Sequence, residues 1–311
     1  MQSGLASEIL KSAVAVGTIS DPSWAAALAP YRVAVTAFAE SLKNESAFFR
    51  MVDAMVPMPL RTKVVKSSST GNASIISEGR VKPITKLTLT SDQIDAVKAV
   101  GILAVSRELA KLQAEGSEKF IRTELRKSVV KAVDAQFLAI LAAAGAITTN
   151  VSAGGDAAAV QTDLSNTFAS LTTSAASRLF WIAGTTTAKH AAAMMKDGVF
   201  LFPDMGPTGG TMANIPAIVS DEITADSLML VDAAQIGGAL ETIVFDVAEH
   251  TSLQFETAPD SPPTGATVPV SLWQHDLSAL RAEVYFGAKP LRSIVAAQLT
   301  LVSWGSPNSP D

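Results

Sequence analysis

Apolar residues recur at every fourth position between residues 121 and 141, and this run constrains the fold more than any other feature of the sequence. The positions are Ile121, Leu125, Val129, Val133, Phe137 and Leu141, with charged side chains on the other faces. The spacing predicts a helix over residues 117–144 that ends at Gly145. At about 1.5 Å per residue this helix is roughly 40 Å long, several times the common length. We expect a structural spine that packs along one side and carries no catalytic groups.

Before this helix, the sequence predicts a long hairpin with little core of its own. A strand is expected over residues 60–66, a polar turn over 67–72, and then a second extended stretch that contains Gly79 and Pro83. A better-buried strand should follow and end near Val105. A mostly polar hairpin of this length cannot offset its ordering entropy alone, so we expect it to lie on a neighbouring molecule.

After the helix, residues 146–155 have the composition of a linker, and helices and strands then alternate. Helices are expected over residues 156–171 and 185–196, and strands over 179–183, 215–219, 228–231, 242–256, 280–286 and 294–302. This alternation is typical of a compact mixed α/β domain.

The composition indicates apolar surface that is covered by partner molecules. Charged residues make up 17% of the chain, against about 25% in ordinary soluble proteins, and the mean hydropathy is +0.29. A membrane span would also account for this, but the longest apolar run, residues 137–147, is far shorter than the roughly 20 residues required. The N-terminus lacks the pattern of a signal peptide. The chain has no cysteine, which excludes disulfides, thiol nucleophiles and thiolate metal sites.

Charge is distributed unevenly along the chain. The formal net charge is −5, but residues 60–98 carry seven basic against three acidic side chains, and residues 145–265 carry three against thirteen. Two solvated faces of one molecule would explain this, and so would electrostatic complementarity between copies of the chain. A nucleic-acid groove is disfavoured, because residues 60–98 contain no aromatic side chain on which a base could stack.

The sequence contains no motif of a known catalytic or nucleotide-binding site. It has no P-loop, no G-x-G-x-x-G, no G-x-S-x-G and no H-E-x-x-H. His190, His250 and His275 are expected to be structural or surface residues. Trp181 and Trp273 are expected to be anchors of the core or of an interface. We therefore expect no enzymatic activity, no cofactor and no metal site.

Three local strings, in this order and spacing, carry a resemblance to a known family. They are residues 78–83 (EGRVKP), residues 105–109 (VSREL) and residues 271–283 (SLWQHDLSALRAE). Together with the order of predicted elements, they resemble the major capsid proteins of tailed bacteriophages with the HK97-like fold, over residues 45–303. The resemblance implies an α+β fold with an N-terminal arm (1–60), an extended hairpin loop (61–92), a peripheral domain (93–149 and 255–288) that contains the spine helix, an axial α/β domain (150–254 and 289–303) and a flexible tail (304–311).

The same resemblance implies a structural role. The chain would assemble with itself into pentamers and hexamers of an icosahedral head, which encloses double-stranded DNA without sequence-specific binding. Assembly would take place in the host cytoplasm, and the product would be the virion capsid. Expected partners are a portal, a decoration protein and a scaffolding protein. The scaffolding protein is expected to be a separate chain, because only about 60 residues precede the hairpin.

The candidates for contacts between subunits are the basic side chains in and beside the hairpin loop. They are Arg61, Lys63, Lys66, Arg80, Lys82 and Lys86. Two alternatives remain open at this point. One is an encapsulin-like shell that shares the fold and encloses a protein cargo, and the other is an oligomeric small-molecule enzyme.

Overall fold

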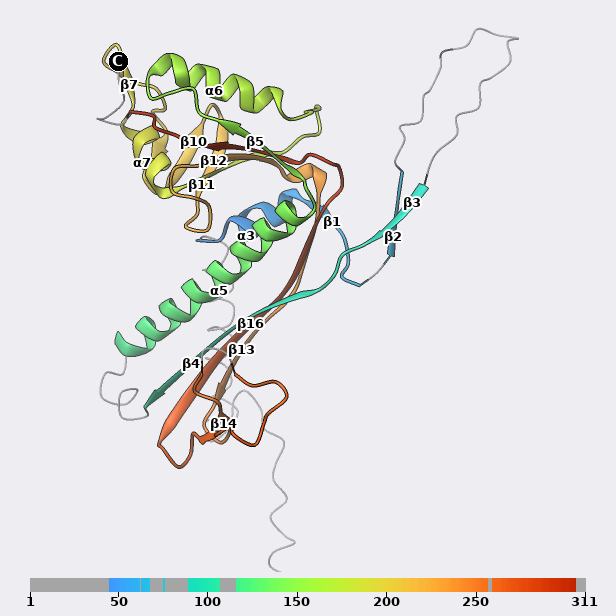
Figure 1. Cartoon of the computed structure of the whole chain (residues 1–311), viewed down its shortest axis with the longest axis vertical. Coiled ribbons are helices and arrows are strands. Elements are labelled where there is room, and N and C mark those ends of the chain that lie inside the picture. The colour runs from blue at the N-terminus through green and yellow to red at the C-terminus, as the bar shows by residue number, and fades with distance from the viewer. Residues whose placement is uncertain are drawn as a thin grey trace, which may run out of the picture. The chain divides into compact units, whose positions relative to one another are not determined.

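The computed structural model describes residues 45–61, 63–67, 75, 89–106, 116–256 and 259–305. Within these residues, the backbone alone is described for 64–67, 89–92, 116–122 and 242. A four-stranded and a seven-stranded sheet form the framework (Figure 1). No helix among the described residues is both long and apolar enough to cross a membrane.

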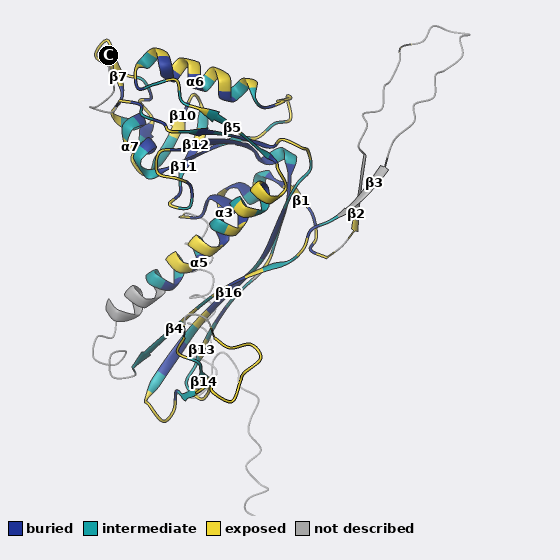
Figure 2. Cartoon of the chain, viewed as in Figure 1, coloured by how far each residue is buried: buried dark blue, intermediate teal, exposed yellow. Residues whose placement is uncertain are grey.

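The four-stranded sheet packs against the predicted spine helix. Its strands, in spatial order, are β1 (Val56–Pro57), β13 (Ile236–Ala248), β16 (Leu277–Pro290) and β4 (Val97–Ser106). Helix α5 (Gly116–Ala143) lies on β4 and β16. Its side chains at 125, 129, 133, 137 and 141 are fully buried, whereas other faces are exposed (Figure 2). The predicted helix is confirmed, and the four-residue repeat marks the side that meets the sheet.

The seven-stranded sheet combines parallel and antiparallel pairs. Its strands, in spatial order, are β5 (Ile147–Val151), β17 (Ala296–Thr300), β12 (Leu228–Asp232), β6 (Leu179–Ala183), β11 (Ile215–Val219), β10 (Gly209–Met212) and β9 (Met205–Gly206). Strand β12 is antiparallel to both β6 and β17, whereas β6 pairs in parallel with β11. Helices α6 (Ala157–Ala169) and α7 (Thr185–Ala193) accompany this sheet.

Shorter elements complete the described residues. They are α3 (Ala47–Met51), the 3-10 turns η1 (Val52–Ala54) and η2 (Ala233–Gln235), and the strand pairs β2 (Lys63–Ser67) with β3 (Leu89–Gln93), β7 (Met195–Lys196) with β8 (Val199–Phe200), and β14 (Ser252–Leu253) with β15 (Val270–Ser271).

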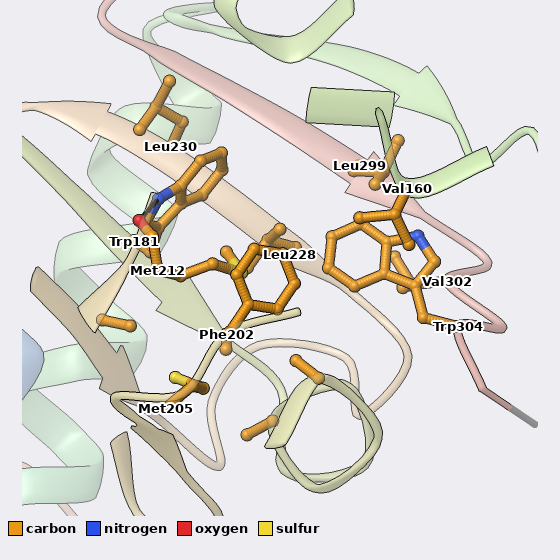
Figure 3. Close-up of a cluster of buried hydrophobic side chains, with 14 of the residues drawn as sticks. Val160, Trp181, Phe202, Met205, Met212, Leu228, Leu230, Leu299, Val302 and Trp304 are labelled. Carbon is orange, nitrogen blue, oxygen red and sulfur yellow. Dashed lines mark hydrogen bonds between the residues drawn. The ribbon is translucent and has the colours of Figure 1, made fainter. Parts of the chain in front are cut away.

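The core beside the seven-stranded sheet is built around two buried tryptophans (Figure 3). The indole N–H of Trp181 donates to the carbonyl oxygen of Met212 at 3.1 Å, so the polar edge of the ring is satisfied inside the core. The indole N–H of Trp304 donates to a carboxylate oxygen of Asp163 at 2.8 Å, and its ring lies 6.4 Å from that of Phe202. Trp304 is fully buried, which corrects its assignment to a flexible tail.

Strand pairing corrects two further boundaries. Residues 236–248 were expected in the axial domain, but β13 pairs with β16 along most of its length and so belongs to the four-stranded sheet. Conversely, β5 pairs with β17, which places residues 147–149 in the seven-stranded sheet. Alternation along a strand reports which side chains are buried and not which sheet receives the strand, so these boundaries could not be read from the sequence.

Candidate assembly surfaces

The described part of the hairpin loop presents basic side chains at its base. Arg61 and Lys63 are exposed. The backbone of Arg61 has a φ of 57° and its N–H donates to the carbonyl oxygen of Ile94 at 2.9 Å, which sets the turn into β2. Lys66 pairs with Thr90 in the β2–β3 ladder. The other three candidates, Arg80, Lys82 and Lys86, lie outside the described residues.

The base of the hairpin is held by a small apolar cluster. Met58, Leu60 and Ile94 are buried together. Leu60 and Ile94 also form an isolated parallel bridge, and the N–H of Met58 donates to the carbonyl oxygen of Gly238 in β13 at 3.1 Å. The loop therefore leaves the four-stranded sheet from a fixed point.

A second fixed point joins α3 to the spine helix through a buried carboxylate. Asp134 on α5 accepts three hydrogen bonds, from Ser46 Oγ at 2.5 Å, the N–H of Ala47 at 2.9 Å and the N–H of Phe48 at 3.1 Å. The first two amides of α3 would otherwise have no partner within the helix. A carboxylate from another element thus caps α3.

An aromatic cluster and an ion pair strengthen the same junction. Phe48 is fully buried, and its ring lies 5.4 Å from that of Phe137 on α5 and 5.1 Å from that of Phe286 on β16. Arg126 on α5 contacts Glu45 at 2.8 Å. Although residues 45–60 were assigned to the N-terminal arm, α3 and β1 pack on the spine helix and β13, so this part belongs to the folded core.

Burial raises the pKa of the Asp134 carboxyl above its ordinary value of 3.8, although its three hydrogen-bond donors act in the opposite direction. Glu222 adds a smaller upward contribution. Asp134 and Glu222 line one groove of about 660 Å³, whose other charged residues are Glu45, Arg50, Lys127, Lys131 and Asp221. The folded state consequently binds the Asp134 proton more tightly than the unfolded chain does.

We expect the stability advantage of the wild type over Asp134→Asn to shrink as the pH rises above 3.8 through the raised pKa. The reason is that deprotonation in this window is easier in the unfolded chain than in the folded protein. The free energy of unfolding, measured with urea at a series of pH values, checks this. Asp221→Asn, at an exposed carboxyl of the same groove, is the control. If the stability advantage of the wild type grew with pH instead, burial would not be the dominant influence on the pKa of Asp134.

Charged side chains also form a network on the four-stranded sheet, centred on the buried carboxylate of Glu283. Arg281 on β16 contacts Asp246 on β13 at 2.6 Å and Glu283 on its own strand at 3.2 Å. Lys98 on β4 contacts Glu283 at 2.8 Å. These pairs link three adjacent strands, and two exposed apolar side chains of β4, Val100 and Ile102, lie among them.

The residues that could carry chemistry are dispersed. His190 lies on α7, whereas His250 and His275 are exposed in the turns after β13 and before β16. Among the described residues, no group of three or more His, Asp and Glu side chains is placed to hold a metal ion. Asp221 and Asp226 are exposed in the turn before β12.

Sequence reasoning missed the buried carboxylates. Asp134, Asp163 and Asp232 each accept hydrogen bonds from backbone amides of another segment. The available clue was weak. Asp134 directly follows Val133 of the apolar repeat. The buried face of a helix in a globular protein often includes such a neighbouring position, but a surface position was equally consistent with the pattern.

The sequence matches the model of the phage capsid family over residues 28–298. It is also 30% identical, over 322 aligned residues and 96% of its length, to the capsid polyprotein of Pseudomonas phage PAJU2. The chain spans about half the length of this relative, covering 48% of it.

Solved structures share the fold at low sequence identity. A chain from Gordonia phage Cozz superposes with a TM-score of 0.58 at 17% identity, covering 83% of this chain and 87% of that one. A chain from Mycobacterium phage Adephagia gives 0.56 at 14% identity, covering 82% and 90%. The capsid of an empty GTA particle gives 0.53 at 13% identity, also covering 82% and 90%. The chain therefore belongs to the phage capsid family and has the HK97-like fold of phage capsid structures.

Proposed function

We propose that this chain forms pentamers and hexamers that close into an icosahedral head around double-stranded DNA. The match to the phage capsid family over residues 28–298 carries this proposal, and it supports self-assembly into capsid shells. One sequence then occupies several quasi-equivalent positions, which requires a rigid core with adaptable connections. The match to the phage capsid family also disfavours the alternative of a small-molecule enzyme.

The hairpin loop would contact an adjacent subunit through its basic side chains. The loop candidates are Arg61, Lys63, Lys66, Arg80, Lys82 and Lys86, of which Arg61 and Lys63 are exposed at the base. They would form ion pairs with exposed acidic side chains in the 145–265 segment of that subunit, such as Asp204, Asp221 and Asp226. Surface pairs of this kind contribute more to register and encounter rate than to affinity.

Other partners follow from the same function. A portal, a decoration protein and a separate scaffolding protein would complete the head, and assembly would take place in the host cytoplasm. Because the chain is acidic overall, with a formal net charge of −5, the inner wall would bind the phosphates of the enclosed DNA only weakly. Mass spectrometry of purified particles would identify these partners and the termini of the capsid chain.

The purified protein, alone or with its scaffold, should form capsomers or shells in sizing and electron microscopy. A stable monomer under both conditions would refute the function. If shells form, their contents separate the two shell hypotheses, because double-stranded DNA identifies a phage head and an enclosed protein cargo identifies an encapsulin-like compartment.

Reversing the charge at Arg80 and Lys82 should lower the yield of shells and leave the fold intact, because these side chains would lose their acidic partners on the next copy. The double variant Lys189→Glu/Lys196→Glu is the matched control, since it changes the net charge equally at exposed positions outside the loop. Electron microscopy counts the shells, and circular dichroism reports the fold. Normal shells from Arg80→Glu/Lys82→Glu would rule out electrostatic docking without refuting the capsid function.

A further inference from the structure

The chain crosses closely over β16 at Gly287, on its way from the hairpin loop into β4. Gly287 lies directly beyond the last residue pair that joins β16 to β4. A β-carbon at this position would lie 2.8 Å from the carbonyl oxygen of Asp95 and 2.7 Å from Cδ2 of Leu60, and it would also clash with Ile94. The crossing therefore leaves room for glycine alone.

The need for glycine at this crossing is one of space and not of backbone conformation. Gly287 does not have a positive φ, so its backbone conformation is open to other residues. The contact with Asp95 involves a backbone atom, which cannot rotate away as the end of a side chain can. An alanine would have to lift the backbone at Asp95 from the sheet by about 1 Å to restore an ordinary contact distance.

A second glycine of the same sheet, Gly238 on β13, is limited in a different way. The Gly238–Ala288 pair is adjacent to the Ala239–Gly287 pair, and successive pairs face opposite sides of a sheet. The atoms nearest to a β-carbon at Gly238 all belong to Met55, with Sδ at 2.6 Å. A methionine side chain is flexible and can adapt. An added methyl group thus displaces a side chain at Gly238 but backbone at Gly287.

Strand β16 also holds the hairpin just before the crossing. Strand β3 ends at Gln93, whose carbonyl oxygen accepts a hydrogen bond from Nζ of Lys289 at 3.2 Å. The same limb is therefore fixed on both sides of Ile94, by Lys289 at Gln93 and by the close approach to Gly287 at Asp95. Two fixed points on one strand define a direction as well as a position.

We propose that Gly287 sets the direction in which the hairpin loop leaves the four-stranded sheet, and so positions the loop on the adjacent subunit. This inference rests on the proposed function, because it assumes the contact between the loop and a neighbouring copy. A rotation at the base moves each residue of the hairpin in proportion to its distance from the base. The five-residue strands β2 and β3 alone extend roughly 16 Å. Gly287 acts through the hairpin and is a positioning residue.

The absence of cysteine allows the direction to be measured with two spin labels. Ser67→Cys carries one label at the end of β2, and Val247→Cys carries the other at an exposed position of β13. Double electron–electron resonance on the unassembled full-length chain gives the distance between the labels. Gly287→Ala should shift the mean distance by at least about 2 Å, since a displacement of about 1 Å at Asp95 is enlarged along the hairpin.

Two alanine substitutions at other glycines are the matched controls. Gly238→Ala adds the same methyl group to the other face of the same sheet, and it should cost stability without shifting the distance. Gly265→Ala adds it where a β-carbon meets no atom within 4 Å, and it should change neither. A shift confined to Gly287→Ala supports the proposal. An unchanged distance in Gly287→Ala, or an equal shift in either control, overturns it.

Lys289→Met provides an independent variant, because it removes the donor to Gln93 and adds no atom at the crossing. It should broaden the distribution of distances, since one of the two fixed points is lost. Should Gly287→Ala fail to fold, a broadened distribution in Lys289→Met supports the proposal and an unchanged one overturns it.

Electron microscopy then tests the consequence for assembly. Gly287→Ala should lose most of its shells, whereas Gly238→Ala and Gly265→Ala should retain them. Normal shells from a Gly287→Ala protein with a shifted distance would overturn the positioning role alone. If the wild type forms no shells, the proposed function fails, while the distance measurement still decides whether Gly287 directs the hairpin.

Discussion

Replacing Phe48 by alanine should lower the free energy of unfolding by about 3–5 kcal/mol, the range for deleting a buried phenylalanine. The side chain is fully buried and joins three elements, because its ring contacts Phe137 on α5 and Phe286 on β16 from its own position on α3. The cavity cannot collapse easily, since a long helix and a paired strand form its walls. Urea unfolding of the disassembled protein measures the loss.

Two controls separate packing from other effects. Phe48→Leu keeps most of the apolar volume and should cost less than about 1.5 kcal/mol. Val199→Ala, at a side chain that is 69% exposed, should have little effect on stability. A cost for Phe48→Ala close to that of the exposed control would show that α3 is not part of the stable core, contrary to its burial.

The same variant has a consequence for assembly. The junction of α3 with α5 is held both by the Phe48 ring and by the carboxylate of Asp134. Loss of the phenylalanine leaves the carboxylate cap from Asp134 in place, since the cap is made by backbone amides and Ser46. Shells that form from Phe48→Ala at reduced temperature would therefore indicate that the cap alone can position the junction.

The sequence predicted the elements that depend on local periodicity. Helix α5 and strand β6 agree with their predicted ranges to within a residue at either end, because apolar spacing is a local property. The partners of each strand depend on distant segments, and β13 was therefore assigned to the other sheet. The expected order of domains came from the resemblance to phage capsid proteins, because apolar periodicity does not show which segments share a domain.

The candidate surfaces were predictable only in part. Clustered basic residues pointed to the hairpin loop, because charge counts require no fold. Trp273 was predicted only as a core or interface residue, since composition does not tell a buried tryptophan from an exposed one, and 67% of its surface is exposed. The ion-pair network of the four-stranded sheet joins residues from β4, β13 and β16, and only the paired sheet brings them together.

Trp304 gives the last prediction. Trp304→Ala should lower the free energy of unfolding by about 3–5 kcal/mol, as for other buried tryptophans. The substitution removes a fully buried ring, and it also removes the indole donor from Asp163. The carboxylate keeps the Ser152 hydroxyl at 2.6 Å and the Ala153 amide at 2.7 Å, so its charge stays partly compensated. Denaturant unfolding, followed by circular dichroism, measures the change.

Two truncations make this prediction specific to the indole. A chain that ends at Gly305 keeps the tryptophan and should be nearly as stable as the full chain. A chain that ends at Ser303 removes it and should lose as much stability as Trp304→Ala. Trp304→Phe should recover the packing but not the hydrogen bond to Asp163. Its free energy of unfolding should therefore lie between those of the two truncated chains. If the shorter truncation is as stable as the longer one, residues 304–305 act as a tail after all, and the burial of the ring contributes nothing to the seven-stranded sheet.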